Sequence, residues 1–319
     1  MSNQVLTGIR RWFESGAGAE EDPNPPSFQE VPYQIDWIRS VPFIALHLTC
    51  FGIIFVGWSL TAVAMAISLY FLRMFFITGF FHRYFSHKAF KTSRFMQFIL
   101  AILGLSCTQK GPLWWAAHHR IHHKHSDGPE DPHSPLQHGF FWSHIGWITD
   151  QRNFPTRVSM VPDLARFREL RFLDRFDLLV PAVMALGLYG LGELLRLHFP
   201  ASGTSGWQML IWGFFVSTVL LFHGSCTINS VAHRMGRKRY ETGDQSRNSF
   251  LLALLTLGEG WHNNHHHYPA TVRQGFFWWE IDITFYLLKM MNWLGLIWDL
   301  RPVPAQVRAA SAPQPGGIG

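Results

Sequence analysis

Long apolar runs alternate with polar segments along the chain. From Val41 to Phe81 the only acidic or basic residue is Arg73. As one helix this run would measure about 60 Å, twice the roughly 30 Å of a bilayer core, so it should fold back once near Gly57. Two later runs are each long enough to span a bilayer on their own. The pattern predicts four transmembrane helices, at about 41–58, 60–81, 178–199 and 207–231.

The connections between these runs predict two hairpins with very short outer turns. The apolar segment from Phe95 to Cys107 is too short to span, which indicates an embedded or interfacial helix. The segment from Phe276 to Trp298 contains acidic and basic residues and should lie on the surface. We therefore expect an all-α integral membrane protein, with four transmembrane helices in two hairpins and a cytoplasmic helical cap.

Both ends of the chain differ in composition from the region between them. Residues 1–31 predict a tail with a short interfacial helix, followed by a linker rich in Pro, Gly and acidic residues, and no cleavable signal. Residues 32–300 should form one membrane domain. Residues 301–319 have the composition of a disordered tail.

Charge sets the expected orientation. Only 15% of the 319 residues are charged, against the usual quarter, which agrees with a membrane protein. Thirteen Lys and Arg residues lie between Arg83 and Arg175, whereas the turn at 200–206 has none. The positive-inside rule therefore places both termini and the histidine clusters in the cytoplasm. The net charge of +6 suits anionic lipid or an acidic partner protein, and no feature indicates nucleic acid.

Histidine is concentrated in a few short segments. In WWAAHHRIHHKHSDGPEDP, Pro112 favours a helix start and SDGP a helix stop. On the predicted helix His119, His122 and His123 stand at i, i+3 and i+4 and share a face. The segment GEGWHNNHHHYP repeats this spacing with His262, His265 and His266. Such repetition is difficult to explain by chance.

Two more segments contribute to the pattern. In CTINSVAHRMG, Asn229 and His233 stand four apart, one turn of helix. In HRYFSH, His82 and His87 stand five apart, which on an α-helix separates the two side chains by roughly 140°. Both can reach one site only if the helix ends or unwinds there.

Nine histidines and one asparagine are enough for two metal ions. Imidazole is a common ligand for iron, zinc, copper and nickel. Metals held at the membrane surface of an apolar protein suggest oxidation of a lipid chain, because an unactivated C–H bond requires a redox metal and dioxygen. Glu259, the one carboxylate close to a triplet, is expected to accept a hydrogen bond from a ligand histidine.

The motifs HRYFSH, HRIHH and HNNHH, in this order among four apolar spans, resemble the histidine boxes of the membrane fatty acyl desaturases, particularly the stearoyl-CoA (delta-9) desaturases. The segments NSVAH, DPHSP, GFFWSHIGW and GEGWH are also similar to that family. The resemblance extends from Pro32 to Trp298 and implies O2-dependent insertion of a cis double bond at the delta-9 position of a saturated acyl chain. Water is the other product.

The resemblance also implies a set of site residues. Two iron ions would be bound by His82, His87, His119, His122, His123, His233, His262, His265 and His266, with Asn229 acting through a water. Tyr70 and Met74 on the second span would close the far end of an acyl tunnel, and Trp115, Trp147 and Trp261 are candidates for its walls. His118, His125, His133, His144 and His267 lie beside the ligand positions and are interpreted as supporting or surface residues.

The sequence leaves several alternatives open. Acyl-CoA desaturases have Arg-Asp where this chain has Ala117-His118, and a later basic pair is Gln151-Arg152, so the acyl carrier could be CoA or membrane phospholipid. The chain has no electron-transfer motif, so a separate ferredoxin, rubredoxin or cytochrome b5 would supply electrons.

The alternative enzyme is a membrane di-iron lipid or alkane hydroxylase. A metal transporter would instead place its ligands within the spans.

Overall fold

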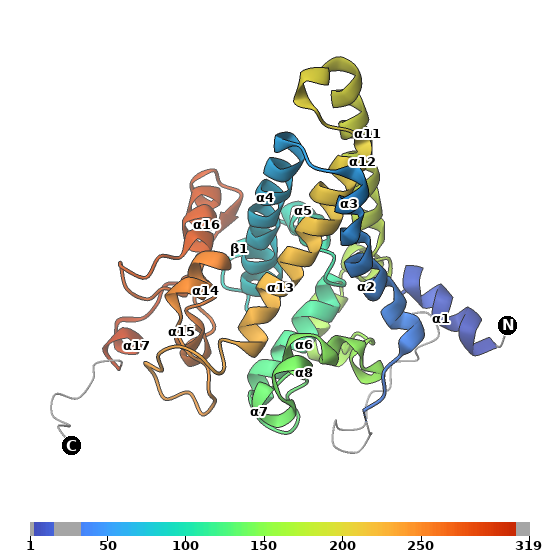
Figure 1. Cartoon of the computed structure of the whole chain (residues 1–319). Coiled ribbons are helices and arrows are strands. Elements are labelled where there is room, and N and C mark those ends of the chain that lie inside the picture. Colours follow the sequence, from blue (N-terminus) through green and yellow to red (C-terminus); the bar gives the residue numbers. More distant parts are fainter. Residues whose placement is uncertain (1–2, 16–32, 311–319) are drawn as a thin grey trace.

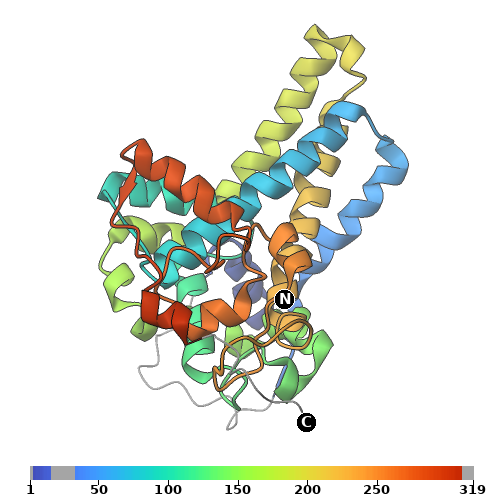
Figure 2. The ribbon, with the colours of Figure 1, turned by 90° about the vertical axis from the view of Figure 1, so that its left-hand side faces the viewer.

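The computed structural model describes residues 3–15 and 33–310 and is mostly helical. Figures 1 and 2 show long helices that extend together from a body of shorter elements. We call this body the head and define it as residues 87–178 and 231–310. Four continuous helical segments are long and apolar enough to cross a membrane: Trp37–Val56, Leu60–Ser86, Leu179–His198 and Gly206–Ser230. The four predicted spans are therefore confirmed as helices, with ends shifted by a few residues.

The four spans differ in the types of helix that compose them. The first consists of α2 (Trp37–Thr49), η1 (Cys50–Gly52) and α3 (Ile53–Val56), and the third is α11 (Leu179–His198). The second consists of α4 (Leu60–Phe75) and the π-helix η2 (Phe76–Ser86). The fourth consists of α12 (Gly206–Gln208), the π-helix η7 (Met209–Val216) and α13 (Ser217–Ser230). Large apolar side chains on their surfaces, such as Phe55 and Leu186, are exposed, as expected of helices that face lipid.

Short turns join the spans at the end away from the head. Gly57 adopts a positive φ of 65°, and the Ser59 hydroxyl then accepts a hydrogen bond from Ala62 N to begin α4. The Ser59 hydroxyl also lies 2.6 Å from the hydroxyl of Thr204, in the other turn. The two turns are thus tied to each other.

The fourth span is the centre of the bundle, since it contacts each of the other three. Arg73, the single charge expected inside the second span, is 1% exposed. It donates hydrogen bonds to the hydroxyls of Ser217 and Thr218 on α13 and to the Ser106 carbonyl. Its charge therefore has polar partners within the protein, as a cation in an apolar environment requires.

The head contains the remaining elements. Between the second and third spans lie β1 (Lys91–Thr92), α5 (Arg94–Leu105), α6 (Pro112–His125), α7 (Pro135–His138), α8 (Phe140–His144), η3 (Gly146–Thr149), η4 (Gln151–Asn153), η5 (Val158–Met160), α9 (Pro162–Ala165) and α10 (Arg168–Arg175). After the fourth span lie α14 (Phe250–Leu255), α15 (His262–His267), α16 (Ile283–Trp293), β2 (Ile297–Trp298) and α17 (Ala305–Ala309). β1 and β2 pair antiparallel. The η6 turn (Pro200–Ser202) belongs to the connection between the third and fourth spans.

The N-terminal helix α1 (Asn3–Phe13) is present, and the linker expected after it lies mostly outside the described residues. Trp12 Nε1 donates a 2.7 Å hydrogen bond to the carbonyl of Ile38 at the start of the first span. The C-terminal prediction is partly wrong, because residues 305–309 form α17 rather than a disordered segment. Residues 311–319 lie outside the described part of the chain.

Candidate metal centre

The π-helix η2 brings the first two histidines together. His87 N donates to the carbonyl of His82 five residues earlier, the hydrogen-bond pattern of a π-helix. This wider turn places residues that are five apart almost above one another, so the rings of His82 and His87 lie 4.9 Å apart. The expected departure from α-helical geometry is confirmed, and it takes the form of a wider helix that ends at Ser86.

The helix α6 supplies three histidines, as predicted, with Pro112 in its first turn. Its N-terminus is held by Asp174, whose carboxylate accepts hydrogen bonds from Leu113 N and Trp114 N. Gly111 permits this contact, since a Cβ there would lie only 2.1 Å from Asp174 Oδ1. The N-terminus of the histidine helix α6 is therefore held in place by α10.

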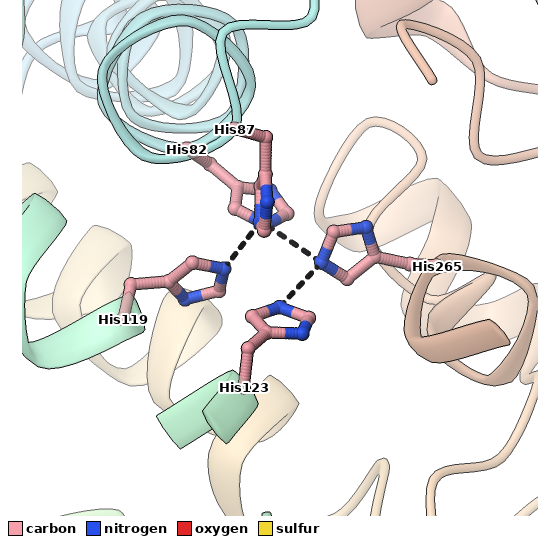
Figure 3. Close-up of side chains that lie close together, drawn as sticks. All are labelled: His82, His87, His119, His123 and His265. Atoms are coloured by element: carbon pink, nitrogen blue, oxygen red, sulfur yellow. Dashed lines mark hydrogen bonds between the residues drawn. The ribbon is translucent and has the colours of Figure 1, made fainter. Parts of the chain in front are cut away.

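The structure divides the nine histidines into two clusters. Within each cluster, the ligand atoms all lie within 4.8 Å of one another. The five-histidine cluster consists of His82, His87, His119, His123 and His265, and its rings point toward a common centre (Figure 3). The four-histidine cluster consists of His122, His233, His262 and His266. Each triplet is thus split between the clusters, a division that the shared helix face did not predict.

Distances within the clusters suit metal coordination. The Nε2 atoms of His87 and His119 are 2.7 Å apart, and those of His123 and His265 are 2.8 Å apart. In the four-histidine cluster the corresponding distance from His233 to His262 is 2.9 Å. Two nitrogens bound at right angles to one ion, each at about 2.1 Å, would lie roughly 3 Å apart.

The position of His233 corrects one prediction. The helix α13 ends at Ser230, and His233 lies in the turn that follows. It is therefore not one helical turn from Asn229 on a continuous helix. The turn directs its ring toward His262 on α15, while Asn229 remains on the helix.

Burial favours the neutral form of several clustered imidazoles, in which one ring nitrogen carries a proton and the other is free to bind a metal. It lowers the pKa of His119, His123 and His265 well below the ordinary 6.5, and the neighbouring imidazoles lower it further. Burial also lowers the pKa of His122, but the carboxylate of Asp131 outweighs this effect and raises it. Neutral imidazoles in close contact form a donor set that fits a metal ion better than it fits water or protons.

Carboxylates hold the outer nitrogens of several rings. His82 Nδ1 lies 2.5 Å from Glu259 Oε2, which confirms the expected contact between Glu259 and a clustered histidine. Contacts of the same kind join His122 to Asp131 (2.9 Å), His233 to Asp127 (2.9 Å) and His266 to Asp244 (2.6 Å). In each case the proton on Nδ1 leaves Nε2 as the atom available to a metal.

Sequence analysis missed Asp127, Asp131 and Asp244. The first two belong to the SDGPEDP segment, which was interpreted as a helix stop, and Asp131 also begins DPHSP, which was noted only for its resemblance to the family. Asp244 lies in the polar loop between the fourth span and α14. A usable signal was present, because these are acidic residues close to histidine motifs in a chain with only 21 acidic residues.

A cavity of about 840 Å³ reaches His119 of the five-histidine cluster. His119, Asn229, Trp115 and Trp147 are among its lining residues, and most of the others are apolar. This volume is within the range of small-molecule sites. Of the residues named as candidates for the tunnel wall, Trp115 and Trp147 line this cavity.

The other tunnel candidates occupy different positions. Met74 lines a smaller cavity of about 60 Å³, together with Asn229 and histidines of both clusters. The Tyr70 hydroxyl donates to the carbonyl of Leu255, and Trp261 Nε1 donates to the carbonyl of Ile281. Within the described residues, neither Tyr70 nor Trp261 lines either of these two cavities.

The remaining histidines have separate roles. His118 and His133 are buried and line the large cavity, while His267 stacks on Tyr240 with the ring centroids 4.0 Å apart. His144 Nε2 lies 3.0 Å from His223 Nδ1, and its Nδ1 lies 2.8 Å from the Ser230 hydroxyl. His125 is half-buried and belongs to neither cluster.

Comparisons with known proteins agree with this geometry. The model of the fatty acid desaturase family matches residues 57–291. An acyl-CoA C20 Delta5-desaturase of Anemone leveillei is 37% identical over 92% of this chain and 94% of its own. An sn-1 stearoyl-lipid 9-desaturase of Anabaena variabilis is 34% identical over 84% of this chain and 94% of its own, and an sn-2 palmitoyl-lipid 9-desaturase of Nostoc sp. (strain 36) is 35% identical over 91% and 96%. The chain belongs to the fatty acid desaturase family.

Proposed function

We propose that this protein is a di-iron, O2-dependent desaturase that inserts a cis double bond at the delta-9 position of a saturated acyl chain. The observation that carries the proposal is the pair of buried histidine clusters, five and four, beside a largely apolar cavity of about 840 Å³. The protein would act in unsaturated fatty acid synthesis. In the balanced reaction, O2, two electrons and two protons remove two hydrogens from the chain and yield two waters.

The histidines, the cavity wall and the carboxylates would each have a distinct role. Nine imidazoles would hold the two ions through Nε2, with Asn229 contributing through a water. Two iron ions would supply the redox chemistry that an unactivated C–H bond requires. The apolar cavity wall would orient the chain and exclude water. The carboxylates on the outer nitrogens keep the Nδ1 protons in place and leave Nε2 free.

The acyl carrier would be CoA or membrane phospholipid. The related proteins include desaturases named for each type of substrate. In place of the charged pair of acyl-CoA desaturases, His118 is buried and donates from Nδ1 to the carbonyl of Trp114. A separate electron donor of the ferredoxin, rubredoxin or cytochrome b5 type would complete the system.

The membrane arrangement is part of the same proposal. The four spans would form two hairpins in the bilayer, and the head, with both termini, would face the cytoplasm. The support is the excess of Lys and Arg between Arg83 and Arg175. A reporter fused after residue 319 should report a cytoplasmic location, and one inserted at 203 should report the opposite side. The reverse result would overturn the orientation.

Expression in a desaturase-deficient host, with lipid-class-resolved mapping of double bonds, tests the function. Loss of two hydrogens at carbons 9 and 10 is expected. A double bond elsewhere would correct the position, and a product that gains oxygen would identify a hydroxylase instead. Labelled acyl chains already esterified in isolated membranes then test the carrier, because desaturation without release of the chain requires a lipid substrate.

Substitutions test the metal centre directly. His122→Ala should abolish desaturation and reduce bound iron, since His122 belongs to the four-histidine cluster. His125→Ala is the matched control, because it removes a histidine from the same helix but from neither cluster. Normal iron content and activity in His122→Ala would refute the ligand assignment.

A further inference from the structure

The two clusters differ in the partners of their outer nitrogens. In the four-histidine cluster, His122, His233 and His266 each have a carboxylate on Nδ1. In the five-histidine cluster, among the residues that the structure describes, only His82 has one, from Glu259. His265 Nδ1 is buried without a hydrogen-bond partner, as is His262 Nδ1 in the four-histidine cluster. The cluster with fewer imidazoles therefore has more carboxylates.

The charge on these carboxylates also differs. Glu259 is shared with Arg83, whose Nη2 lies 3.1 Å from Glu259 Oε1. Its negative charge is therefore partly compensated by a cation that is 1% exposed and that Glu259 shares with Asp282. A compensated carboxylate increases the electron density of the histidine ring less than a free one does.

The three carboxylates of the four-histidine cluster have neutral partners besides the histidines. Asp127 accepts from the Ser134 hydroxyl and Gln245 N, and Asp131 accepts from the backbone N–H groups of Asp127 and His133. Within the described part of the chain, neither forms an ion pair with Lys or Arg.

Asp244 also has neutral hydrogen-bond donors besides its histidine. Its second oxygen, Oδ1, accepts from the hydroxyls of Thr242 and Ser246 and from Ser246 N, and no described Lys or Arg pairs with it. Oδ2 remains for His266 Nδ1. All three acidic side chains are thus fixed by neutral donors and direct an uncompensated negative charge at a ring.

A carboxylate on Nδ1 makes the opposite nitrogen a stronger donor and fixes the ring orientation. We propose that Asp127, Asp131 and Asp244 are positioning residues that make the four-histidine position the tighter of the two metal positions, although it has one imidazole fewer. This inference rests on the proposed iron centre. The five-histidine position would then exchange its metal ion more readily than the four-histidine position.

Anaerobic Fe²⁺ binding to the purified full chain tests this inference, with a series of chelators to measure each dissociation constant. Reference Mössbauer spectra of ⁵⁷Fe in His262→Gln and His265→Gln would identify which position is occupied. In the unsubstituted protein we expect the five-histidine position to empty first. Asp244→Asn should weaken the four-histidine position by about 10- to 100-fold and leave the other unchanged.

A matched control separates metal tuning from loop stability. Asp163→Asn removes a carboxylate that pairs with Arg120 on the histidine helix and contacts none of the clustered rings. It should leave both dissociation constants unchanged even where it lowers the melting temperature. Equal constants in the unsubstituted protein, earlier loss from the four-histidine position, or no selective effect of Asp244→Asn would each overturn the inference. Failure of the unsubstituted protein to bind two irons would overturn the proposed function itself.

Discussion

Nη2 of Arg83 lies 2.9 Å from Oδ1 of Asp282, and the two side chains are 1% and 0% exposed. Asp282 also accepts a hydrogen bond from Phe285 N and so begins α16. One ion pair therefore joins the π-helix of the second span to the C-terminal part of the head. Because the residue before Arg83 is a clustered histidine, this pair also fixes one wall of the metal centre.

Arg83→Met should destabilise the protein by about 3–5 kcal/mol, since it leaves the buried carboxylates of Asp282 and Glu259 without their cation. Chemical denaturation in detergent measures the change. Arg94→Met is the matched control, because Arg94 pairs with Glu169 at the surface and should matter much less. Equal effects of the two substitutions would contradict the structural role of Arg83.

The pair between Arg120 and Asp163 predicts a pH dependence. Burial raises the pKa of Asp163, but hydrogen bonds from Arg120 and Lys88 outweigh it and lower the pKa to about 2, below its ordinary 3.8. The carboxylate is therefore more easily ionised in the folded state. Its contribution, about 1 kcal/mol because solvent screens this partly exposed pair, is present above pH 4 and is lost as the pH falls from about 4 to 2.

Asp163→Asn should remove this contribution. The difference in unfolding free energy between the original protein and the variant should be constant from pH 7 to 5 and shrink at pH 3. Denaturation curves at these three pH values measure it. A difference that grew on acidification would mean that the pair does not stabilise the fold.

We predict that Met74 limits the length of the acyl chain. It lies eight residues before His82, with part of the π-helix η2 between them, and it lines the small cavity beside both clusters. Met74→Ala should lengthen this space and shift the products from 16- toward 18-carbon chains. Product ratios are measured by mass spectrometry and normalised to folded enzyme.

Met209→Ala provides the control for Met74, because both methionines are 0% exposed and Met209 packs in a separate apolar cluster. Both substitutions should cost roughly 2–5 kcal/mol of stability. Only Met74→Ala should change the ratio of products. An unchanged ratio would show that Met74 has a packing role alone.

Gly111, at the start of α6, lies against Asp174 of α10. In Gly111→Ala the new Cβ would lie 2.5 Å from the Cα of Asp174, so the N-terminus of the histidine helix must shift. We expect a lower melting temperature and a loss of bound iron. Gly187→Ala is the control, since a Cβ there meets nothing within 4 Å. Retention of full iron content by Gly111→Ala would show that α6 tolerates the shift.

The sequence was informative where one residue type has one physical role. Apolar runs of sufficient length predicted the four spans, and Pro112 predicted the start of α6. The histidine motifs predicted all nine members of the two clusters, because imidazoles repeated at helical spacing have few other uses. Glu259 was also expected to contact a clustered ring.

Features that depend on contacts between distant segments were not predictable in this way. Asp127 and Asp244 are 117 residues apart and meet only because two loops fold over the same cluster. The split of His122 from His119 and His123 depends on where α15 and the turn at His233 lie. Similarly, local residue pattern gave no reason to distinguish Trp115, which lines the large cavity, from Trp261, which does not.

The π-helix has a consequence for transplanting the first histidine motif. A peptide with the sequence HRYFSH placed on an ordinary α-helical scaffold would hold its two imidazoles roughly 140° apart and could not chelate one ion. In this protein the wider turn is held by contacts made far away in the chain, including those of Arg83 with Asp282 and with the carbonyl of Val272. The hexapeptide alone would therefore not bind a metal ion in the same way when it is moved to another protein. A designer who wants this pair of ligands must copy the partners that keep the helix wide as well as the motif.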